Sequence, residues 1–258
     1  MTTRRRFLSG LVGSGSVIFG YSAIGGGRAN DITDKNVEII GHRGSSAKYE
    51  DNSVEGIRFA GRNGADGVEL DIRRTADDFL ILNHYPFRFN GMGSYDISDR
   101  TYNQIKESTG SAVKLGEAVD IVREYDMDLI VGMKEPANAQ MIWDRIIEEG
   151  YRERSRMVMW TRHIDDYLVD AEKTIIVTTP PDTSLIQQAE EYNIDTVMCH
   201  YANGGVGYFI DKANENGLNA GYWSLVGSTT DLRKGLSKDP DVVMTNRPKE
   251  AVQMLGEY

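Results

Sequence analysis

The sequence contains one cysteine, Cys199, and fewer basic than acidic residues among its 258 positions. A single cysteine forms neither an intrachain disulfide nor a thiolate metal cluster. The 29 lysines and arginines against 39 aspartates and glutamates give a formal net charge of -10. That charge repels polyanions, which argues against nucleic acid as a partner. Any phosphate that the protein handles must therefore be bound by cationic side chains gathered locally.

The sequence also lacks long apolar runs, domain linkers and repeats. A membrane-spanning helix needs about 20 consecutive apolar residues, whereas 26% charged residues are typical of an ordinary soluble globular chain. No linker rich in proline, glycine and serine interrupts residues 31–258, and no repeat with a period of about 20 to 50 residues is evident. We therefore predict a single folded domain over residues 31–258.

The N-terminus has the features of an export signal. Three consecutive arginines at residues 4–6 precede an uncharged, glycine-diluted stretch at residues 7–27. Small residues at positions 27 and 29 suit a signal-peptidase cleavage site. This pattern resembles a twin-arginine signal. We predict that residues 1–30 direct export to the periplasm or the extracellular space, with an uncleaved weak anchor or a disordered tail as the alternatives.

Short apolar runs alternate with longer amphipathic segments through the rest of the chain. The runs expected to be strands are residues 37–40, 68–72, 79–82, 129–131, 157–160, 174–178, 196–199, 218–223 and 242–244. The segments expected to be helices are residues 53–62, 114–125, 139–149, 164–172, 185–192, 207–216, 230–236 and 249–255. Alternation of strand and helix is typical of a parallel sheet. About eight evenly spaced strands favour an α/β fold of the (β/α)8 TIM-type barrel class, with an open doubly wound sheet as the alternative.

The turn after the first predicted strand, at residues 41–44, lacks the G-x-G-x-x-G pattern of a dinucleotide site, so no nucleotide cofactor is expected. Each of the four histidines closely follows an apolar run: His42, His84, His163 and His200. Active sites of barrels lie at the carboxyl ends of the strands, so each histidine is a candidate. We expect structural roles for His163 and His200, whereas the neighbours of His42 and His84 make these two the catalytic candidates.

Glu69 and Asp71 are two residues apart in a predicted strand, so both carboxylates project from one face, with Arg73 next along it. In a barrel strand that face is the interior, where an unpaired charge costs several kcal/mol. Inward carboxylates therefore need partners, and their oxygens suit Mg²⁺ or Ca²⁺. A solvated strand face would explain the same alternation only if the barrel prediction were wrong.

His42 is followed directly by Arg43 and Gly44. The planar fork of a guanidinium matches two oxygens of a phosphate, and a glycine lets the backbone come close to a ligand. His84 follows a different strand and supplies a second imidazole. Two imidazoles, each with an ordinary pKa of about 6.5, can divide acid and base work on a phosphodiester at neutral pH.

Taken in order, several short motifs resemble the glycerophosphodiester phosphodiesterase family. The opening H-R-G of that family corresponds to residues 42–44, and its G-A-D-x-x-E-x-D block corresponds to residues 64–71. Further similar segments lie at residues 50–53, 74–77, 217–224 and 245–248. The resemblance therefore covers nearly all of residues 31–258.

The resemblance implies a (β/α)8 barrel that hydrolyses small-molecule glycerophosphodiesters with a divalent cation, Mg²⁺ or Ca²⁺. It implies no protein partner. The residues that it implies are the acid/base pair His42 and His84, the cation ligands Glu69 and Asp71, and the phosphate-binding Arg43 and Lys134. Trp223 is a candidate apolar wall for glycerol or the head group, with core packing as an equal alternative.

Two departures from the family pattern bear on activity. The family's E-I-K strand supplies a third cation-binding glutamate, and Gly132 stands at that position here. Glu135 is nearby, but the period of two along a strand points it away from the interior unless a bulge intervenes. The family's His-Asp pair is His84-Tyr85 in this chain, so we expect that no carboxylate orients the second imidazole and that Tyr85 is at most a hydrogen bonder.

These departures leave three functions open. The first is an exported, cation-assisted phosphodiesterase. The second is a metal-independent or lyase-like phospholipase acting on a lipid head group, in which the guanidinium of Arg73 or Arg162 replaces the missing carboxylate and its cation. The third is a non-catalytic barrel that binds phosphate through Arg43 and Lys134. Retention of both histidines and both carboxylates favours catalysis, because buried charges without a function only reduce stability.

Overall fold

The computed structural model of the chain describes residues 36–89, 93–201, 204–224 and 228–256. The described residues belong to one compact unit. The predicted export signal, residues 1–30, lies outside them. None of the described helices is long and apolar enough to cross a membrane.

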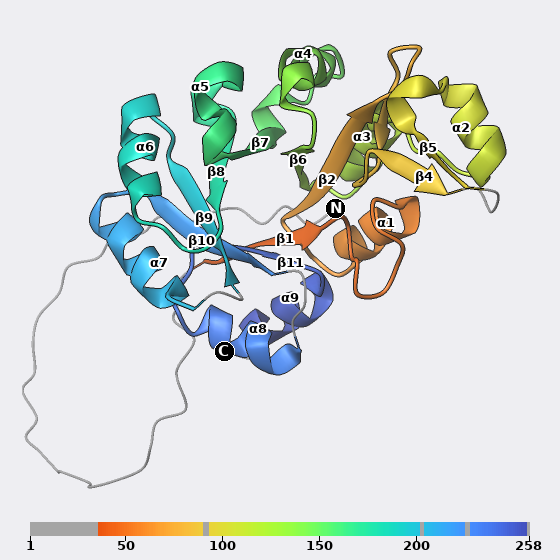
Figure 1. Ribbon diagram of the computed structural model, residues 1–258. Helices are drawn as coiled ribbons and strands as arrows, with labels where there is room; N and C mark the ends of the chain where they lie inside the picture. The colour runs from red at the N-terminus through yellow and green to blue at the C-terminus, as the bar shows by residue number, and fades with distance from the viewer. Residues whose placement is uncertain (1–35, 90–92, 202–203, 225–227, 257–258) are drawn as a thin grey trace, which may run out of the picture. The chain divides into compact units, whose positions relative to one another are not determined.

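In the described part of the chain, eight parallel strands close into a barrel (Figure 1). The strands, in order around the barrel, are β1 (Glu38–His42), β2 (Gly67–Arg74), β6 (Asp128–Met133), β7 (Ser155–Trp160), β8 (Thr174–Thr178), β9 (Thr196–His200), β10 (Asn219–Ser224) and β11 (Val242–Thr245). Strand β11 pairs with β1, which closes the ring. The predicted (β/α)8 barrel is confirmed, and the alternative of an open sheet is wrong.

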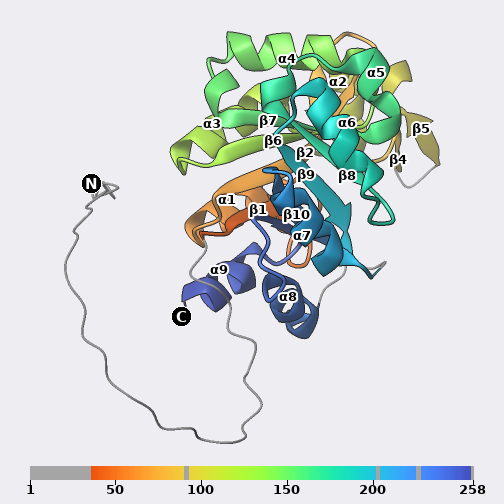
Figure 2. The same ribbon diagram turned by 90° about the vertical axis from the view of Figure 1, so that its left-hand side faces the viewer.

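Helices surround this barrel on the outside (Figure 1). They are α1 (Val54–Arg62), α3 (Leu115–Glu124), α4 (Ala139–Glu148), α5 (Ile164–Tyr167), α6 (Ser184–Tyr192), α7 (Val206–Glu215), α8 (Thr229–Leu236) and α9 (Pro248–Gly256). In Figure 2, α3 to α6 lie on the opposite side of the strands from α8 and α9. Local signals begin several helices: the Ser53 side chain accepts a hydrogen bond from the amide of Gly56 at the start of α1, as expected of an N-cap.

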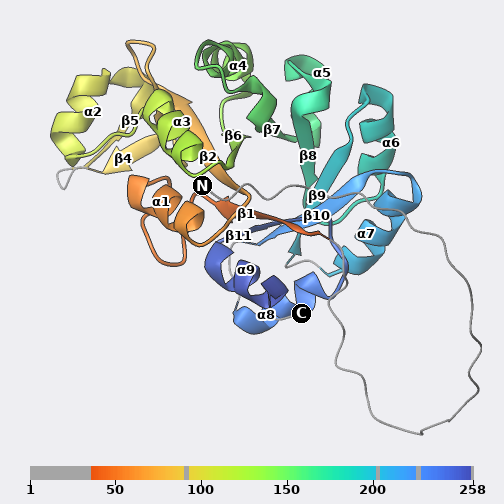
Figure 3. The same cartoon turned by 180° about the vertical axis from the view of Figure 1, so that it is seen from behind.

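An insertion between β2 and α3 departs from the expected alternation. The predicted strand at residues 79–82 is β3 (Leu80–Leu82), which pairs antiparallel with β2 and is not a barrel strand. The hairpin of β4 (Phe87–Phe89) and β5 (Ser94–Asp96) follows, and then helix α2 (Tyr102–Thr109). Figures 1 and 3 show these elements outside the ring of helices, beside α1 and α3.

The predicted helix at residues 164–172 is also shorter than expected. Helix α5 ends at Tyr167, and Leu168 takes an extended conformation. With four residues, α5 is a single turn, and short 3-10 helices at Thr161–His163 and Ala171–Lys173 make up most of the rest of this crossover.

Alternate residues of the barrel strands face the interior and the helices. The residues that fill the interior are Ile40, Ile130, Ile175, Met198 and Val242. On β2, by contrast, Val68, Leu70 and Ile72 pack outward into the cluster formed with the helices. The barrel is therefore a packed core and not a pore. The inward positions left over, at the carboxyl ends of the strands, are where polar side chains can gather.

Candidate active site

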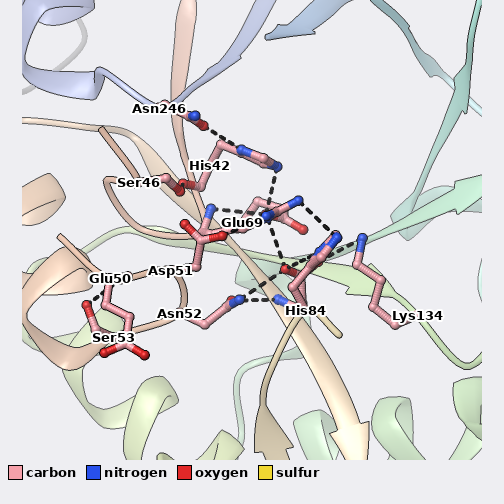
Figure 4. Close-up of polar contacts among 12 residues, drawn as sticks. His42, Ser46, Glu50, Asp51, Asn52, Ser53, Glu69, His84, Lys134 and Asn246 are labelled. Carbon is pink, nitrogen blue, oxygen red and sulfur yellow. Dashed lines mark hydrogen bonds and ion pairs between the residues drawn. The ribbon is translucent and has the colours of Figure 1, made fainter. Parts of the chain in front are cut away.

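His42 ends β1 at the carboxyl end of the barrel. Its Nδ1 lies 2.6 Å from the Oδ1 of Asn246. Because an amide oxygen only accepts hydrogen bonds, Nδ1 carries the proton, and Nε2 has a free lone pair. Nε2 lies 3.8 Å from Oε2 of Glu69, and Figure 4 shows the ring between these two partners. Burial, with the neighbouring Arg43 charge, lowers the pKa of His42 to about 4, so the ring is neutral and can act as a base.

A tight turn places Arg43 next to His42. Arg43 and Gly44 both have positive φ angles, 51° and 87°. At Gly44 a Cβ atom would also come within 2.8 Å of the backbone of Gly56, so only glycine suits this position. The turn directs the Arg43 guanidinium to Asp51 Oδ2 at 2.6 Å, and its Nη2 lies 3.3 Å from Nε2 of His84.

Asp71 is fully buried. It is the hub of a polar cluster, by which we mean the polar side chains that lie within hydrogen-bonding distance of Asp71 or of one another at this end of the barrel. Its Oδ2 accepts a hydrogen bond from Asn52 at 3.0 Å and lies 3.0 Å from His84 Nδ1. The expectation that no carboxylate orients the second imidazole is therefore wrong, because the pairing of β3 with β2 brings His84 beside Asp71. Arg43 Nε is 3.2 Å from the same oxygen, and Lys134 Nζ is 2.9 Å from Oδ1. Although burial alone would raise the pKa of Asp71, the His84 hydrogen bond and the charges of Lys134 and Arg43 hold it well below its usual range.

Glu69 has the opposite electrostatic environment on the same strand face. Only 4% of the residue is exposed, and Oε2 accepts a hydrogen bond from the backbone amide of Arg43 at 3.1 Å. Burial and the neighbouring Asp71 charge raise the pKa of Glu69. The site therefore holds one carboxyl group that stays charged and one that is readily protonated in the absence of a nearby cation.

Gly132 lies opposite Asp71 in the pairing of β6 with β2. A Cβ atom at Gly132 would collide with Glu69 Oε1 and lie 2.9 Å from Asp71 Oδ1. The two carboxylates thus converge over space that the missing side chain leaves open. Carboxylate oxygens are the ligands that Mg²⁺ and Ca²⁺ prefer. The two carboxylates would fit a divalent cation, with water completing its shell, once the Lys134 ammonium leaves Asp71 Oδ1.

The donor set is limited to those two carboxylates. Among the described residues, no group of three or more histidine, cysteine, aspartate or glutamate side chains converges as a metal site. Glu135 does not join Glu69 and Asp71: its Oε1 accepts a hydrogen bond from Arg73 Nη1 at 2.8 Å. The expectation that Glu135 points away from the two carboxylates agrees with this geometry.

The pocket at the carboxyl end has a polar and an apolar side, within a cavity of about 230 Å³. The polar side is formed by the residues described above. The apolar side is formed by Val158, Trp160, Val177, Trp223 and Met244 from the later strands. Trp223 therefore lines the pocket and also packs against the barrel core, and its contact with substrate stays a prediction. The rings of Trp160 and Trp223 are nearly perpendicular, with centroids 5.9 Å apart.

Three of the remaining candidates lie beside aromatic side chains, whereas Arg73 borders the polar cluster by donating to the backbone carbonyl of His84. His200 packs against Trp223 with ring centroids 4.2 Å apart, and His163 lies beside Tyr167 at 6.2 Å. The Arg162 guanidinium stacks over the Trp160 ring at 5.0 Å. The Arg73 guanidinium is paired with the Glu135 carboxylate, and not with Glu69 or Asp71. Neither guanidinium is therefore placed as a substitute for the cation.

Three polar residues of the cluster were not among the sequence-based candidates: Asp51, Asn52 and Asn246. Asn52 adopts a φ of 60°, and its Oδ1 accepts a hydrogen bond from the amide of Asp71 at 2.9 Å. The similarity of residues 50–53 and 245–248 to family motifs was the available signal. That similarity did not indicate a role for these residues, because their partners are separated from them by 8 to 204 positions in the sequence.

The carboxyl end of this barrel gathers two imidazoles, a guanidinium, an ammonium and two carboxylates. This set of groups is chemically suited to binding an anion and to transferring protons. The chain matches the model of the glycerophosphoryl diester phosphodiesterase family over residues 42–249. It therefore belongs to that family. The match includes every catalytic, substrate-binding and cation-binding candidate named from the sequence.

Known proteins show the same relationship at lower coverage or identity. Glycerophosphodiester phosphodiesterase 1 of Rattus norvegicus is 38% identical over 77 residues, which are 30% of this chain and 23% of the rat protein. The matched segment thus spans about a quarter of that relative's length. The crystal structure of glycerophosphodiester phosphodiesterase from Thermotoga maritima has a TM-score of 0.73 at 21% identity, covering 86% of this chain and 100% of that one.

A phosphodiesterase from Oleispira antarctica, solved in complex with the product sn-glycerol-3-phosphate, has a TM-score of 0.69 at 14% identity. It covers 85% of this chain and 96% of that one. At these identities the structural likeness shows the fold.

Proposed function

We propose that the chain is an exported phosphodiesterase that hydrolyses glycerophosphodiesters, the deacylated phospholipids, to an alcohol and glycerol phosphate. One observation carries the proposal: His42, Arg43, His84 and Lys134 converge at a single pocket around a buried carboxylate hub. Family membership supports the reaction class. The glycerol phosphate bound by the Oleispira antarctica phosphodiesterase supports the substrate class.

In the proposed mechanism His42 is the base. Its Nδ1–H is held by Asn246, so Nε2 accepts a proton from the nucleophile, which is either water or a vicinal hydroxyl of the substrate. Attack at phosphorus breaks the bond to the leaving alcohol. His84 enters this step protonated at both ring nitrogens, with Arg43 Nη2 turned from His84 Nε2 to the phosphate, and Nε2–H donates the proton that the leaving oxygen needs. Product analysis separates the two nucleophiles, because a vicinal hydroxyl forms a cyclic phosphate first.

Arg43 and Lys134 bind the phosphate in this proposal. Both lie within 3.2 Å of Asp71, which holds two flexible cationic side chains in place before substrate arrives. A preorganised guanidinium and ammonium stabilise the charge that grows on the phosphoryl oxygens during attack. Trp223 packs against the carbon skeleton of glycerol or of the head group.

Glu69 and Asp71 would hold the divalent cation, Mg²⁺ or Ca²⁺. Such a cation, when bound, polarises a phosphoryl oxygen as a Lewis acid. With two carboxylates as its only protein ligands, the site should bind Mg²⁺ or Ca²⁺ weakly, because affinity falls with ligand charge count.

Turnover of glycerophosphocholine and of a chromogenic phosphodiester by the purified protein tests these proposals. The assay is run with and without EDTA, beside His42→Ala. Cleavage that is lost with EDTA and in the variant supports the cation-assisted mechanism. Cleavage that survives EDTA but not the substitution favours metal-independent catalysis, with Lys134 and Arg43 as the cations. Absence of cleavage with added Mg²⁺ or Ca²⁺ overturns the enzymatic proposal and favours a phosphate-binding barrel.

Export is a separate part of the proposal and rests on residues 1–30 of the sequence. The full chain expressed in a bacterium with a twin-arginine system should accumulate outside the cytoplasm, shortened by about the length of that segment. The double substitution of Arg4 and Arg5 by lysine should hold it in the cytoplasm. Equal distribution of both forms between fractions would contradict the export signal.

A further inference from the structure

Arg73 is the third inward-facing charged residue of β2, after Glu69 and Asp71, and it is 8% exposed. Its Nη1 donates to Oε1 of Glu135 at 2.8 Å. Its Nη2 and Nε both donate to the backbone carbonyl of His84, at 2.9 and 3.3 Å. A buried guanidinium is costly unless its donors are used, and three of its N–H groups are used on these two partners.

The carbonyl that Arg73 holds belongs to the residue proposed to protonate the leaving alcohol. His84 follows β3 in a short irregular segment. Its ring is oriented by Asp71 through Nδ1 at 3.0 Å, and the amide of the preceding Asn83 donates to the carbonyl of Asp71 at 2.9 Å. Arg73 in addition donates hydrogen bonds to the backbone carbonyl of His84. Both the imidazole ring and the backbone of His84 are therefore held by hydrogen bonds.

Glu135 connects Arg73, and through it the backbone of His84, to the segment that carries Lys134. It directly follows Lys134, whose ammonium lies on Asp71. Its second oxygen, Oε2, accepts hydrogen bonds from Asn138 Nδ2 at 2.7 Å and from the amide of Arg74 at 3.3 Å. The carboxylate is thus held firmly, and the segment after β6 is tied through Arg73 to the segment after β3.

We propose, on the basis of the function proposed above, that Arg73 and Glu135 are positioning residues for the reaction. The pair locks the His84 backbone to the end of β6, so that the His84 imidazole and the Lys134 ammonium meet at Asp71 in a fixed relation. Hydrogen bonds that aim a reacting group matter because misplacement by about 1 Å can reduce a rate about 100-fold.

The test is Arg73→Lys, which keeps the positive charge but loses the fork that grips the carbonyl. On glycerophosphocholine we expect kcat to fall about 10- to 100-fold and KM to change by less than about threefold, because phosphate binding is retained. Glu135→Gln should also lower kcat with little change in KM, and the fall in kcat should be smaller than in Arg73→Lys. A rise in KM at unchanged kcat would contradict a role in positioning His84.

A substrate that needs no proton on its leaving group sharpens the test. p-Nitrophenolate departs unprotonated, so His84→Ala should be milder on a p-nitrophenyl phosphodiester than on glycerophosphocholine. Arg73→Lys must follow the same pattern if it acts through His84. In the double variant with His84→Ala, the added substitution should cost less than about twofold, because the two residues act as a unit. Equal losses on both substrates, or additive losses in the double variant, would overturn the proposal.

Arg156→Lys is the matched control. Arg156 pairs with Glu38 near the amino ends of β7 and β1, away from the pocket. The same substitution there should leave both kcat and KM unchanged. If Arg156→Lys lowers kcat to the same extent as Arg73→Lys, the effect is general loss of barrel integrity and the positioning role is wrong.

A measurement that does not depend on turnover separates this proposal from the proposed function. In ¹⁵N-histidine NMR spectra of the full chain, with the His84 signals assigned by His84→Ala, Arg73→Lys should shift or broaden the His84 signals and leave those of His42 in place. Unchanged His84 signals would refute the positioning role even if the wild-type protein is active. Shifted signals in an inactive wild type would uphold the geometry and reject the enzymatic function.

Discussion

The two sides of the pocket are built by different parts of the chain and by different physical principles. Strand β2 and the residues just after β1, β3 and β6 supply polar and charged side chains that pair with one another around Asp71. Strands β7, β8, β10 and β11 supply only apolar and aromatic side chains at the equivalent inward positions. A low-dielectric wall facing paired charges strengthens their electrostatic effect on a bound phosphate. The polar side should therefore govern turnover, and the apolar side should govern binding.

The largest expected effect comes from removing the charge at the hub. Asp71→Asn removes the charged partner of Lys134 and leaves Arg43 paired with the more exposed Asp51, and breaking a buried pair costs about 3–5 kcal/mol. Turnover should fall at least about 1000-fold, because phosphate-binding and proton-transfer groups lose their common anchor. Denaturant unfolding and kcat measure the two effects.

Asp51→Asn is the matched control, since Asp51 also pairs with Arg43 but its side chain is 38% exposed. Exposed ion pairs contribute about 0 to 1 kcal/mol. Equal losses of stability in the two variants would contradict the distinction between a buried hub and its exposed neighbour.

A smaller effect is expected from Asn246→Ala. This change removes the acceptor for His42 Nδ1–H and lets the other tautomer form, so kcat should fall about 10- to 100-fold, as for other groups that orient a reacting imidazole. Asn246→Asp keeps an acceptor and should recover much of the loss. If both variants lose kcat equally, the hydrogen bond does not orient His42.

Gly132→Ala tests whether the open space between the carboxylates is required. The added methyl group collides with Glu69, and overpacking costs about 1–3 kcal/mol. We expect kcat to fall and the concentration of Mg²⁺ needed for half-maximal activity to rise. Gly256→Ala, where no atom lies within 4 Å of the added Cβ, is the control and should leave both stability and activity unchanged.

The smallest effect on turnover is expected on the apolar side. Trp223→Leu should raise KM about three- to tenfold with little change in kcat, because it removes contact that is equal in the ground and transition states. Trp143→Leu makes the same substitution in the layer between barrel and helices, and should lower the unfolding free energy without raising KM. A large fall in kcat in Trp223→Leu would contradict the view that the apolar side of the pocket governs binding and not turnover.

The barrel could be predicted because its signal is local and repeated. Short apolar runs are typical of parallel strands that are buried on both faces, and the amphipathic segments between them are typical of helices that cover such a sheet. The exceptions show the limit of that signal. The run at residues 79–82 is as apolar as the others, yet it forms β3, which pairs antiparallel with β2 outside the barrel. The pairing partner of a strand depends on tertiary contacts that the apolar run does not encode.

The candidate site could be predicted only in part, for the same reason. Glu69 and Asp71 share a face through their spacing, and the motif at residues 42–44 marks the first strand end. The orientation of His42, however, depends on Asn246, which is 204 positions away. The catalytic roles, the cation and the export of the chain stay predictions that the experiments above address.

The sequence by itself determined the class of fold, the face on which the carboxylates lie and the residue types that meet at the strand ends, since these follow from periodicity and chemistry along the chain. Only the tertiary structure decided which charges pair with which. Asp71 pairs with Arg43, His84 and Lys134, whereas Glu135 pairs with Arg73. The physical reason is that a buried charge takes the partner that the closed barrel brings within hydrogen-bonding distance, and barrel closure joins segments that are far apart in the sequence.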